Sequence, residues 1–197
     1  MPVVLGLPRG GVPVAEEVAV ALGAPLDILV ARKVGAPGNP ELAIGAVAGD
    51  VTHLDERTIS QLAIPRRFIN RAVAVEQEEE RHREARFRQG RAPLDVAGRT
   101  IILVDDGLAT GATAMAAIAA LRTHHPAKVI LAVPIAAQDT LDRMRAVADE
   151  VVCLYMPVVF FAVGQGYHDF RPTTDDEVRA ILARAAHATA ASPPSAA

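Results

Sequence analysis

Cysteine is nearly absent from this sequence of 197 residues, which contains only Cys153. A single cysteine can form no internal disulfide bond and no CxxC metal site, so the chemistry must come from other side chains. Long apolar runs are also absent. No stretch approaches the roughly 20 residues of a membrane span. The first residues also lack the succession of charged, apolar and small residues that forms a signal peptide. We therefore expect a cytoplasmic protein that makes no contact with a membrane.

The sequence also has no excess of positive charge. The formal net charge is -3, whereas nucleic-acid binders usually have a clearly basic balance. This charge argues against a nucleic-acid partner and favours a small-molecule ligand. Hydrophobic residues make up 51% of the chain and charged residues 22%, a composition typical of a soluble globular domain.

Short β-branched or aliphatic runs alternate with alanine-rich stretches along the chain. We expect strands at residues 2–7, 26–31, 101–104, 129–134 and 151–154. We expect helices at residues 12–22, 113–123 and 140–147. Apolar strands that alternate with helices are typical of parallel βαβ units. The predicted fold is therefore α/β, with a doubly wound, mostly parallel sheet flanked by helices.

Residues 43–91 depart from this alternation. Residues 43–48 and 51–54, joined through Gly49 and Asp50, indicate a β-hairpin that forms a small flap or hood. Residues 65–91 mix arginine with glutamate and predict a solvated helix. We expect one domain over residues 1–184 with this region as an insertion, and a disordered tail over residues 185–197. Strand-like residues begin at Met1, which leaves open whether a segment precedes them.

Two adjacent carboxylates, Asp105 and Asp106, follow the aliphatic residues 101–104. Ligands of open α/β sheets bind outside the carboxyl ends of strands, so this pair should face a crevice. A run of small residues then enters a helix, where backbone N–H groups and the helix dipole favour a phosphate. The run consists of Ala109, Thr110, Gly111, Ala112 and Thr113. The two carboxylates could hold vicinal hydroxyls or Mg²⁺, and the run of small residues could bind a phosphate, so together they fit a ribose 5-phosphate. The alternative is that these residues only cap a helix.

The pattern Asp-Asp-x-x-x-Thr-Gly-x-Thr after aliphatic residues resembles the motif with which type I phosphoribosyltransferases bind phosphoribosyl pyrophosphate (PRPP). The resemblance covers residues 2–178 and is greatest to a bacterial group of predicted phosphoribosyltransferases. It implies that Asp105 and Asp106 hold the ribose hydroxyls and Mg²⁺, while residues 109–113 bind the 5-phosphate. Two positions depart from the pattern: many members have an aliphatic residue at Gly107, and several purine enzymes have an acid at Ala109.

Two basic loops are similar to other parts of the same family. Arg9, Gly10 and Gly11 follow the first expected strand and resemble the pyrophosphate-binding loop, with an ordinary strand-to-helix turn as the alternative. Arg32 and Lys33 begin a Gly- and Pro-containing stretch that resembles the mobile catalytic loop, with a surface hairpin connection as the alternative. The resemblance implies catalytic roles for Arg9, Arg32 and Lys33, and a pairing of Glu41 with one of the last two.

Aromatic residues occur in the segment 160–171, which is similar to the base-binding segment of purine phosphoribosyltransferases. Phe161 is in the stacking position, although buried core aromatics are the alternative. The resemblance as a whole implies a homodimer that transfers the phosphoribosyl group of PRPP to a nucleobase with Mg²⁺. Two other functions stay open: a PRPP- or nucleotide-binding regulatory protein without turnover, and a sugar-phosphate hydrolase.

Overall fold

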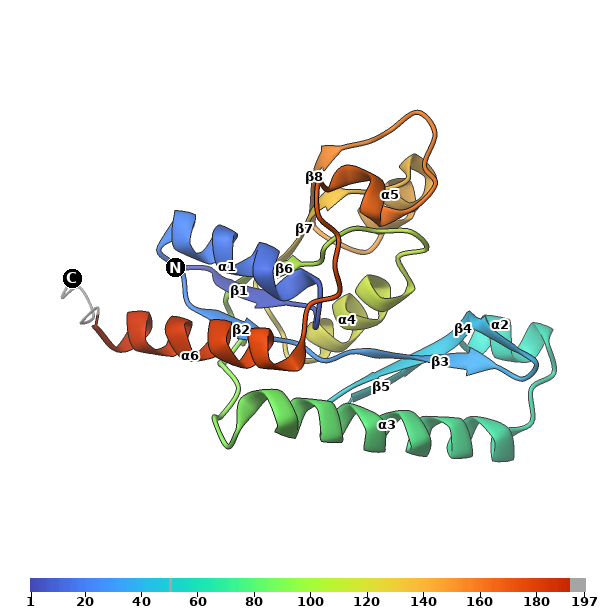
Figure 1. Cartoon of the computed structure of the whole chain (residues 1–197). Helices are drawn as coiled ribbons and strands as arrows, with labels where there is room; N and C mark the ends of the chain where they lie inside the picture. Colours follow the sequence, from blue (N-terminus) through green and yellow to red (C-terminus); the bar gives the residue numbers. More distant parts are fainter. Residues whose placement is uncertain (50, 192–197) are drawn as a thin grey trace.

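A computed structural model describes residues 1–49 and 51–191 of the chain. Its centre is a five-stranded sheet in the order β2-β1-β6-β7-β8, in which every neighbouring pair is parallel. The strands are β1 (Val3–Gly6), β2 (Leu26–Ile28), β6 (Thr100–Val104), β7 (Lys128–Ile135) and β8 (Glu150–Tyr155). The predicted parallel α/β sheet is confirmed, and β6 lies at its middle, between β1 and β7 (Figure 1).

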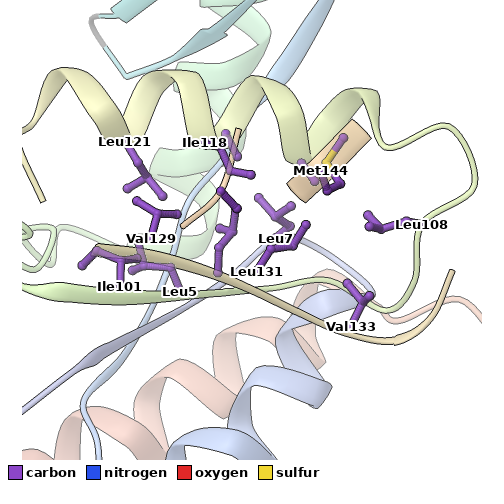
Figure 2. Packing of buried hydrophobic residues seen from close by; sticks show 14 of the residues in the cluster. Leu5, Leu7, Ile101, Leu108, Ile118, Leu121, Val129, Leu131, Val133 and Met144 are labelled. Atoms are coloured by element: carbon purple, nitrogen blue, oxygen red, sulfur yellow. The ribbon is translucent and has the colours of Figure 1, made fainter. Parts of the chain in front are cut away.

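Helices cover both faces of this sheet at β1 and β6, which explains why these strands are almost continuously apolar, whereas β8 is largely exposed. Helices α4 (Ala112–Thr123) and α5 (Gln138–Arg145) pack on one face with Leu5, Ile101 and Leu131 (Figure 2). Helices α1 (Gly11–Leu22) and α6 (Asp175–Ala191) pack on the other face with Val4 and Val104. Successive strand residues thus enter opposite cores.

A second, three-stranded antiparallel sheet corresponds to the predicted flap. It consists of β3 (Arg32–Ala36), β4 (Asn39–Ala48) and β5 (Val51–Leu54), in that order. Helix α2 (Glu56–Gln61) follows it, and the long helix α3 (Arg66–Arg88) packs against β3 and β4 (Figure 1). The hairpin predicted from residues 43–54 is confirmed, while Asp50 lies outside the described residues.

Two of the sequence predictions need correction. The stretch expected to be a mobile loop is instead β3 and the start of β4, joined at Pro37 and Gly38, because its main chain pairs with that of residues 43–47. The tail expected to be disordered from residue 185 is helical as far as Ala191, as part of α6. Val178, Ile181 and Leu182 of this helix are buried against α1 and β2. Residues 192–197 lie outside the described residues.

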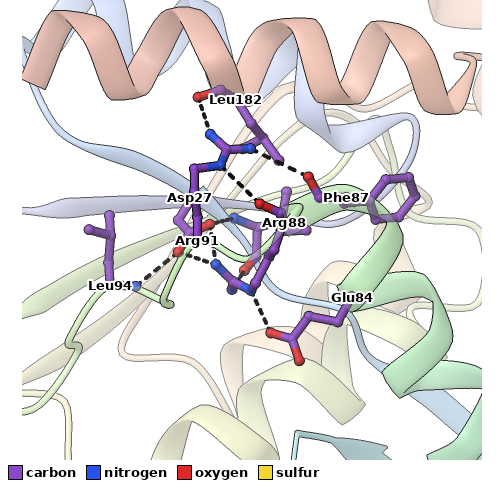
Figure 3. Close-up of polar contacts among 8 residues, drawn as sticks. Asp27, Glu84, Phe87, Arg88, Arg91, Leu94 and Leu182 are labelled. Carbon is purple, nitrogen blue, oxygen red and sulfur yellow. Dashed lines mark hydrogen bonds and ion pairs between the residues drawn. The ribbon is translucent and has the colours of Figure 1, made fainter.

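The charged helix α3 is less solvated than predicted, because its C-terminal end is buried. Arg88 and Asp27 of β2 are only 9% and 8% exposed. The two oxygens of Asp27 each accept a 2.8 Å hydrogen bond from Arg88 Nη1, and one of them also accepts from the Leu94 N–H (Figure 3). Arg88 reaches Glu84 as well, at 2.6 Å. This network fixes α3 to the edge of the main sheet.

Among the described residues, no helix is both long and apolar enough to cross a bilayer.

Candidate active site

The two adjacent carboxylates lie where β6 ends, at the middle of the main sheet. Asp105 Oδ1 accepts a 2.9 Å hydrogen bond from the Asp106 N–H. Burial, and then the negative charge of Asp106, raise the pKa of Asp105 to about 8. Burial also raises the pKa of Asp106. A cation near this pair would stabilise both carboxylates in their charged form.

The loop between β1 and α1 presses directly against these carboxylates. A Cβ atom on Gly10 would lie 1.7 Å from Asp106 Oδ2, and one on Gly11 would lie 2.6 Å from the Val104 carbonyl oxygen. The loop is held there by a 2.9 Å hydrogen bond from the Leu7 N–H to the same carbonyl. Gly11 is therefore required by its close approach to the backbone, whereas a side chain at Gly10 would displace the Asp106 carboxylate. The structure brings Gly10 and Gly11 together with the aspartates, as the sequence predicts.

Arg9 lies in the same loop, and its guanidinium points toward α6. Arg9 Nη1 is 3.3 Å from Asp175 Oδ1, and Arg86 Nη1 of α3 is 2.6 Å from the other oxygen of Asp175. Burial of Asp175 opposes ionisation, but hydrogen bonds from Arg9 and Arg86 outweigh it and lower the pKa of this carboxyl. The Asp175 carboxylate thus pairs with two arginines, and the Arg9 side chain remains half-exposed beside Asp106.

The predicted phosphate loop follows, with Ala109, Thr110 and Thr113 exposed. Its carbonyl groups are held from behind. The Leu108 carbonyl accepts from the Ala137 N–H at 3.3 Å, and the Ala109 carbonyl accepts from Thr140 Oγ1 at 2.6 Å. Since C=O and N–H point in opposite directions across a trans peptide, these bonds turn the next N–H groups toward solvent.

Helix α5 supplies most of this support. Arg143 Nη2 donates to the Thr110 carbonyl at 3.3 Å and to Thr140 Oγ1 at 3.0 Å. Gly111 has a φ of 71° and leaves room for the Thr140 methyl group, 2.9 Å from where a Cβ would lie. Within residues 1–49 and 51–191, the N–H groups of Ala109, Thr110 and Gly111 have no hydrogen-bond partner. Three free donors at the start of α4 form a site suited to an anion.

Arg32 and Lys33 are the first two residues of strand β3 in the small sheet. Arg32 Nε donates to Glu76 Oε2 of α3 at 2.6 Å, so its guanidinium is engaged with that helix. Lys33 is the next residue of the strand, and successive side chains of a strand point to opposite faces. The Lys33 side chain is therefore on the face of β3 opposite to Arg32. Helix α4 also packs on this small sheet. Arg32 therefore contacts α3 and does not line the cleft that contains Asp106. The side chain of Glu41 lies outside the described side chains.

A cleft of about 750 Å³ opens beside Arg9 and Asp106. The aromatic residues that line it are Tyr167 and Phe170, whose ring centroids are 5.0 Å apart. Tyr167 donates its hydroxyl proton to the Asp106 carbonyl oxygen at 2.5 Å. Burial, and then the charges of Asp106 and Asp105, raise the pKa of Tyr167 to about 12, so it stays a donor.

Phe161, the residue expected to stack on a base, does not line this cleft. Its side chain is 84% exposed. Residues of α6 and Arg83 of α3 line the cleft instead, and neither was predicted there from the sequence. The signal for α6 is present in its apolar spacing: Val178, Ile181, Leu182 and Ala185 recur with a helical period.

A parallel α/β sheet with paired carboxylates and an anion loop at its central strand defines a nucleotide- or sugar-phosphate-binding class of domain. Residues 1–169 match the family model described as the phosphoribosyl transferase domain, so the chain belongs to that family. The family predicted from the sequence is confirmed.

Known relatives agree with this assignment. Two proteins of Mycobacterium tuberculosis, from strains CDC 1551 and H37Rv and provisionally named phosphoribosyl transferases, are 51% identical over 184 residues. The match covers 93% of this chain but 42% of each of those proteins, so the chain spans less than half their length. A crystal structure of a Thermus thermophilus protein superposes with a TM-score of 0.86 at 45% identity, over 93% of this chain and 87% of that one.

Proposed function

We propose that this chain transfers the 5-phosphoribosyl group of PRPP to a nitrogenous base and releases pyrophosphate, with Mg²⁺ as the cofactor. The observation that best supports the proposal is that three features meet at the end of β6. These are the aspartate pair, the glycine loop that presses against Asp106, and the phosphate loop with its free N–H groups. Each suits a different part of PRPP: the ribose hydroxyls, the pyrophosphate and the 5-phosphate.

The reaction needs positioning and charge stabilisation more than covalent chemistry. The lone pair of the acceptor nitrogen forms a bond to C1 of the ribose, while the bond from C1 to the pyrophosphate oxygen breaks and its electron pair leaves with pyrophosphate. The Arg9 side chain and the N–H groups of Arg9 and Gly10, which have no hydrogen-bond partner among the described residues, stabilise that leaving charge. The proton of the nitrogen passes to solvent, because Ala109 offers no base at that position.

Mg²⁺ fits the oxygen donors of Asp105 and Asp106. Within the described part of the chain, no group of three or more His, Cys, Asp or Glu side chains is arranged to hold a metal. Two carboxylates are enough for Mg²⁺, which typically binds one or two of them together with substrate phosphates. When bound, the ion supplies charge neutralisation for the pyrophosphate, and the aspartates hold and orient it.

Calorimetry of PRPP binding with and without Mg²⁺ tests this proposal, comparing wild type with Asp105→Asn/Asp106→Asn. We expect Mg²⁺-dependent binding that the double variant loses by at least about 100-fold, since two charged contacts disappear. Asp139→Asn/Asp142→Asn makes the same charge change on the exposed surface of α5 and should bind normally. Folded protein that binds no PRPP would overturn the proposal.

A regulatory protein that binds PRPP without turnover is the second candidate, and one observation favours it: Arg32 is engaged with Glu76 instead of the site. A pyrophosphate-release assay across a panel of nucleobases separates the two functions. Release with at least one acceptor supports the transferase, whereas binding without release supports the regulator. The expected homodimer and cytoplasmic location stay predictions, which light scattering and cell fractionation test.

A further inference from the structure

The cleft beside Asp106 has the size and the composition of a small-molecule site. Its volume of about 750 Å³ lies in the usual range for ligand pockets. The ring of Phe170 is 46% exposed and lies next to Tyr167. A flat ring placed against Phe170 would lie close to the hydroxyl of Tyr167, which is bonded to the Asp106 main chain. An acceptor in the cleft would therefore lie near the ribose that the aspartates are proposed to hold.

The arginines that line the cleft are paired with carboxylates, with one exception. Arg171 is 2.5 Å from Glu177, and Arg184 is 2.8 Å from Glu16. Arg83 also lines the cleft, but it has no hydrogen-bond or ion-pair partner among residues 1–49 and 51–191. The cleft thus presents one guanidinium whose charge no carboxylate neutralises.

Arg83 is the residue that helix α3 contributes to the lining of the cleft. Arg83 precedes Arg86 by three residues on α3, so both side chains lie on the same face of the helix. Arg86 is joined through Asp175 to Arg9 of the pyrophosphate loop. A ligand that spans the cleft from Phe170 toward α3 would meet Arg83 with its outer edge.

We propose that this cleft takes the acceptor and that the acceptor is a planar nitrogen-containing ring with one carboxylate group, which Arg83 binds. A guanidinium matches a carboxylate through two parallel hydrogen bonds. A single negative charge matches Arg83, the one arginine of the cleft that no carboxylate of the described residues neutralises. The inference rests on the proposed transfer from PRPP and names the class of its acceptor.

Matched pairs of acceptors test the inference: pyridine-3-carboxylate against pyridine-3-carboxamide, and uracil-6-carboxylate against uracil. Binding of each to the PRPP- and Mg²⁺-loaded protein is measured by calorimetry, and pyrophosphate release is measured in parallel. Wild type should bind the carboxylate of at least one pair about 10- to 100-fold more tightly, the range expected for hydrogen bonds to a charged group. Equal binding of both members in each pair would overturn the inference.

The variant Arg83→Gln should abolish this preference, and Arg83→Lys should retain part of it. Arg81→Gln removes an exposed arginine of α3 that pairs with Glu78 and does not line the cleft, so it should keep the preference. PRPP binding should be unchanged in all three variants. A preference that survives in Arg83→Gln refutes the role of Arg83. Wild type that binds no PRPP would instead count against the transferase proposal itself. A failure of the acceptor inference can therefore be told apart from a failure of the proposed function.

Discussion

Gly10 is the residue at which the site depends on a single missing methyl group. Its φ of -61° and ψ of -34° are allowed for any residue, so alanine would cause no backbone strain. The only obstacle is the Asp106 carboxylate, 1.7 Å from the added Cβ. Gly10→Ala should therefore leave the melting temperature nearly unchanged and lower PRPP affinity at least about tenfold by displacing Asp106.

A glycine far from the site provides the opposite control. Gly98 has a φ of 64° and open space around it, so Gly98→Ala meets strain but no neighbour. That variant should lose about 1–2 kcal/mol of stability and bind PRPP as wild type does. Thermal unfolding and calorimetry on both variants measure the two effects. Normal PRPP binding by Gly10→Ala would show that Asp106 is not held by this contact.

At the scale of elements, helix α5 is expected to keep the phosphate loop ready for its ligand. Thr140→Val keeps the shape of the side chain but removes the hydroxyl that fixes the Ala109 carbonyl. The peptide would then turn more freely, and we expect the Kd for PRPP to rise about tenfold, because a lost buried hydrogen bond costs about 1–3 kcal/mol. Thr140→Ser keeps the hydroxyl and should restore the affinity.

Thr123→Val is the matched control, since its hydroxyl also donates to a carbonyl, that of Ala120, but at the other end of α4. It should alter stability without altering the Kd. An unchanged Kd in Thr140→Val, or an equal change in Thr123→Val, would contradict the role of α5. Measuring KM and kcat separately adds a second readout, because the loop is expected to act on PRPP binding and not on the chemical step.

The elements that the sequence predicts well are those whose pattern is local. Strands β1, β6 and β7 are aliphatic runs, with β1 buried at every position and β6 and β7 on at least one face, and the motif at Asp105 follows β6 directly. Strand β3 was missed because Arg32 and Lys33 start it and Gly35 interrupts it, so only pairing with β4 makes it a strand. The cleft was missed for a related reason: Arg83, Tyr167 and α6 meet only after the chain has folded.

At the scale of the whole molecule, the two sheets have separate hydrophobic cores. Ile69 of α3 packs with Val34, Ile44 and Val47 under the small sheet, whereas Ile118 of α4 packs with Leu103 and the other central strands. Cooperative units of a protein often coincide with such clusters and open at different free energies. The small sheet and the N-terminal part of α3 are thus expected to open without the main sheet.

Hydrogen exchange on two core variants tests this division. Ile69→Ala and Ile118→Ala each remove a side chain that is 1% exposed, a change that typically costs about 2–5 kcal/mol. Ile69→Ala should speed amide exchange in β3, β4 and the N-terminal part of α3 while leaving β6 and β7 protected. Ile118→Ala should speed exchange in both sheets, because α4 also packs on β3, β4 and β5. If Ile69→Ala speeds exchange in β6 as much as in β4, the molecule opens as one unit, and the small sheet cannot move independently over a bound substrate.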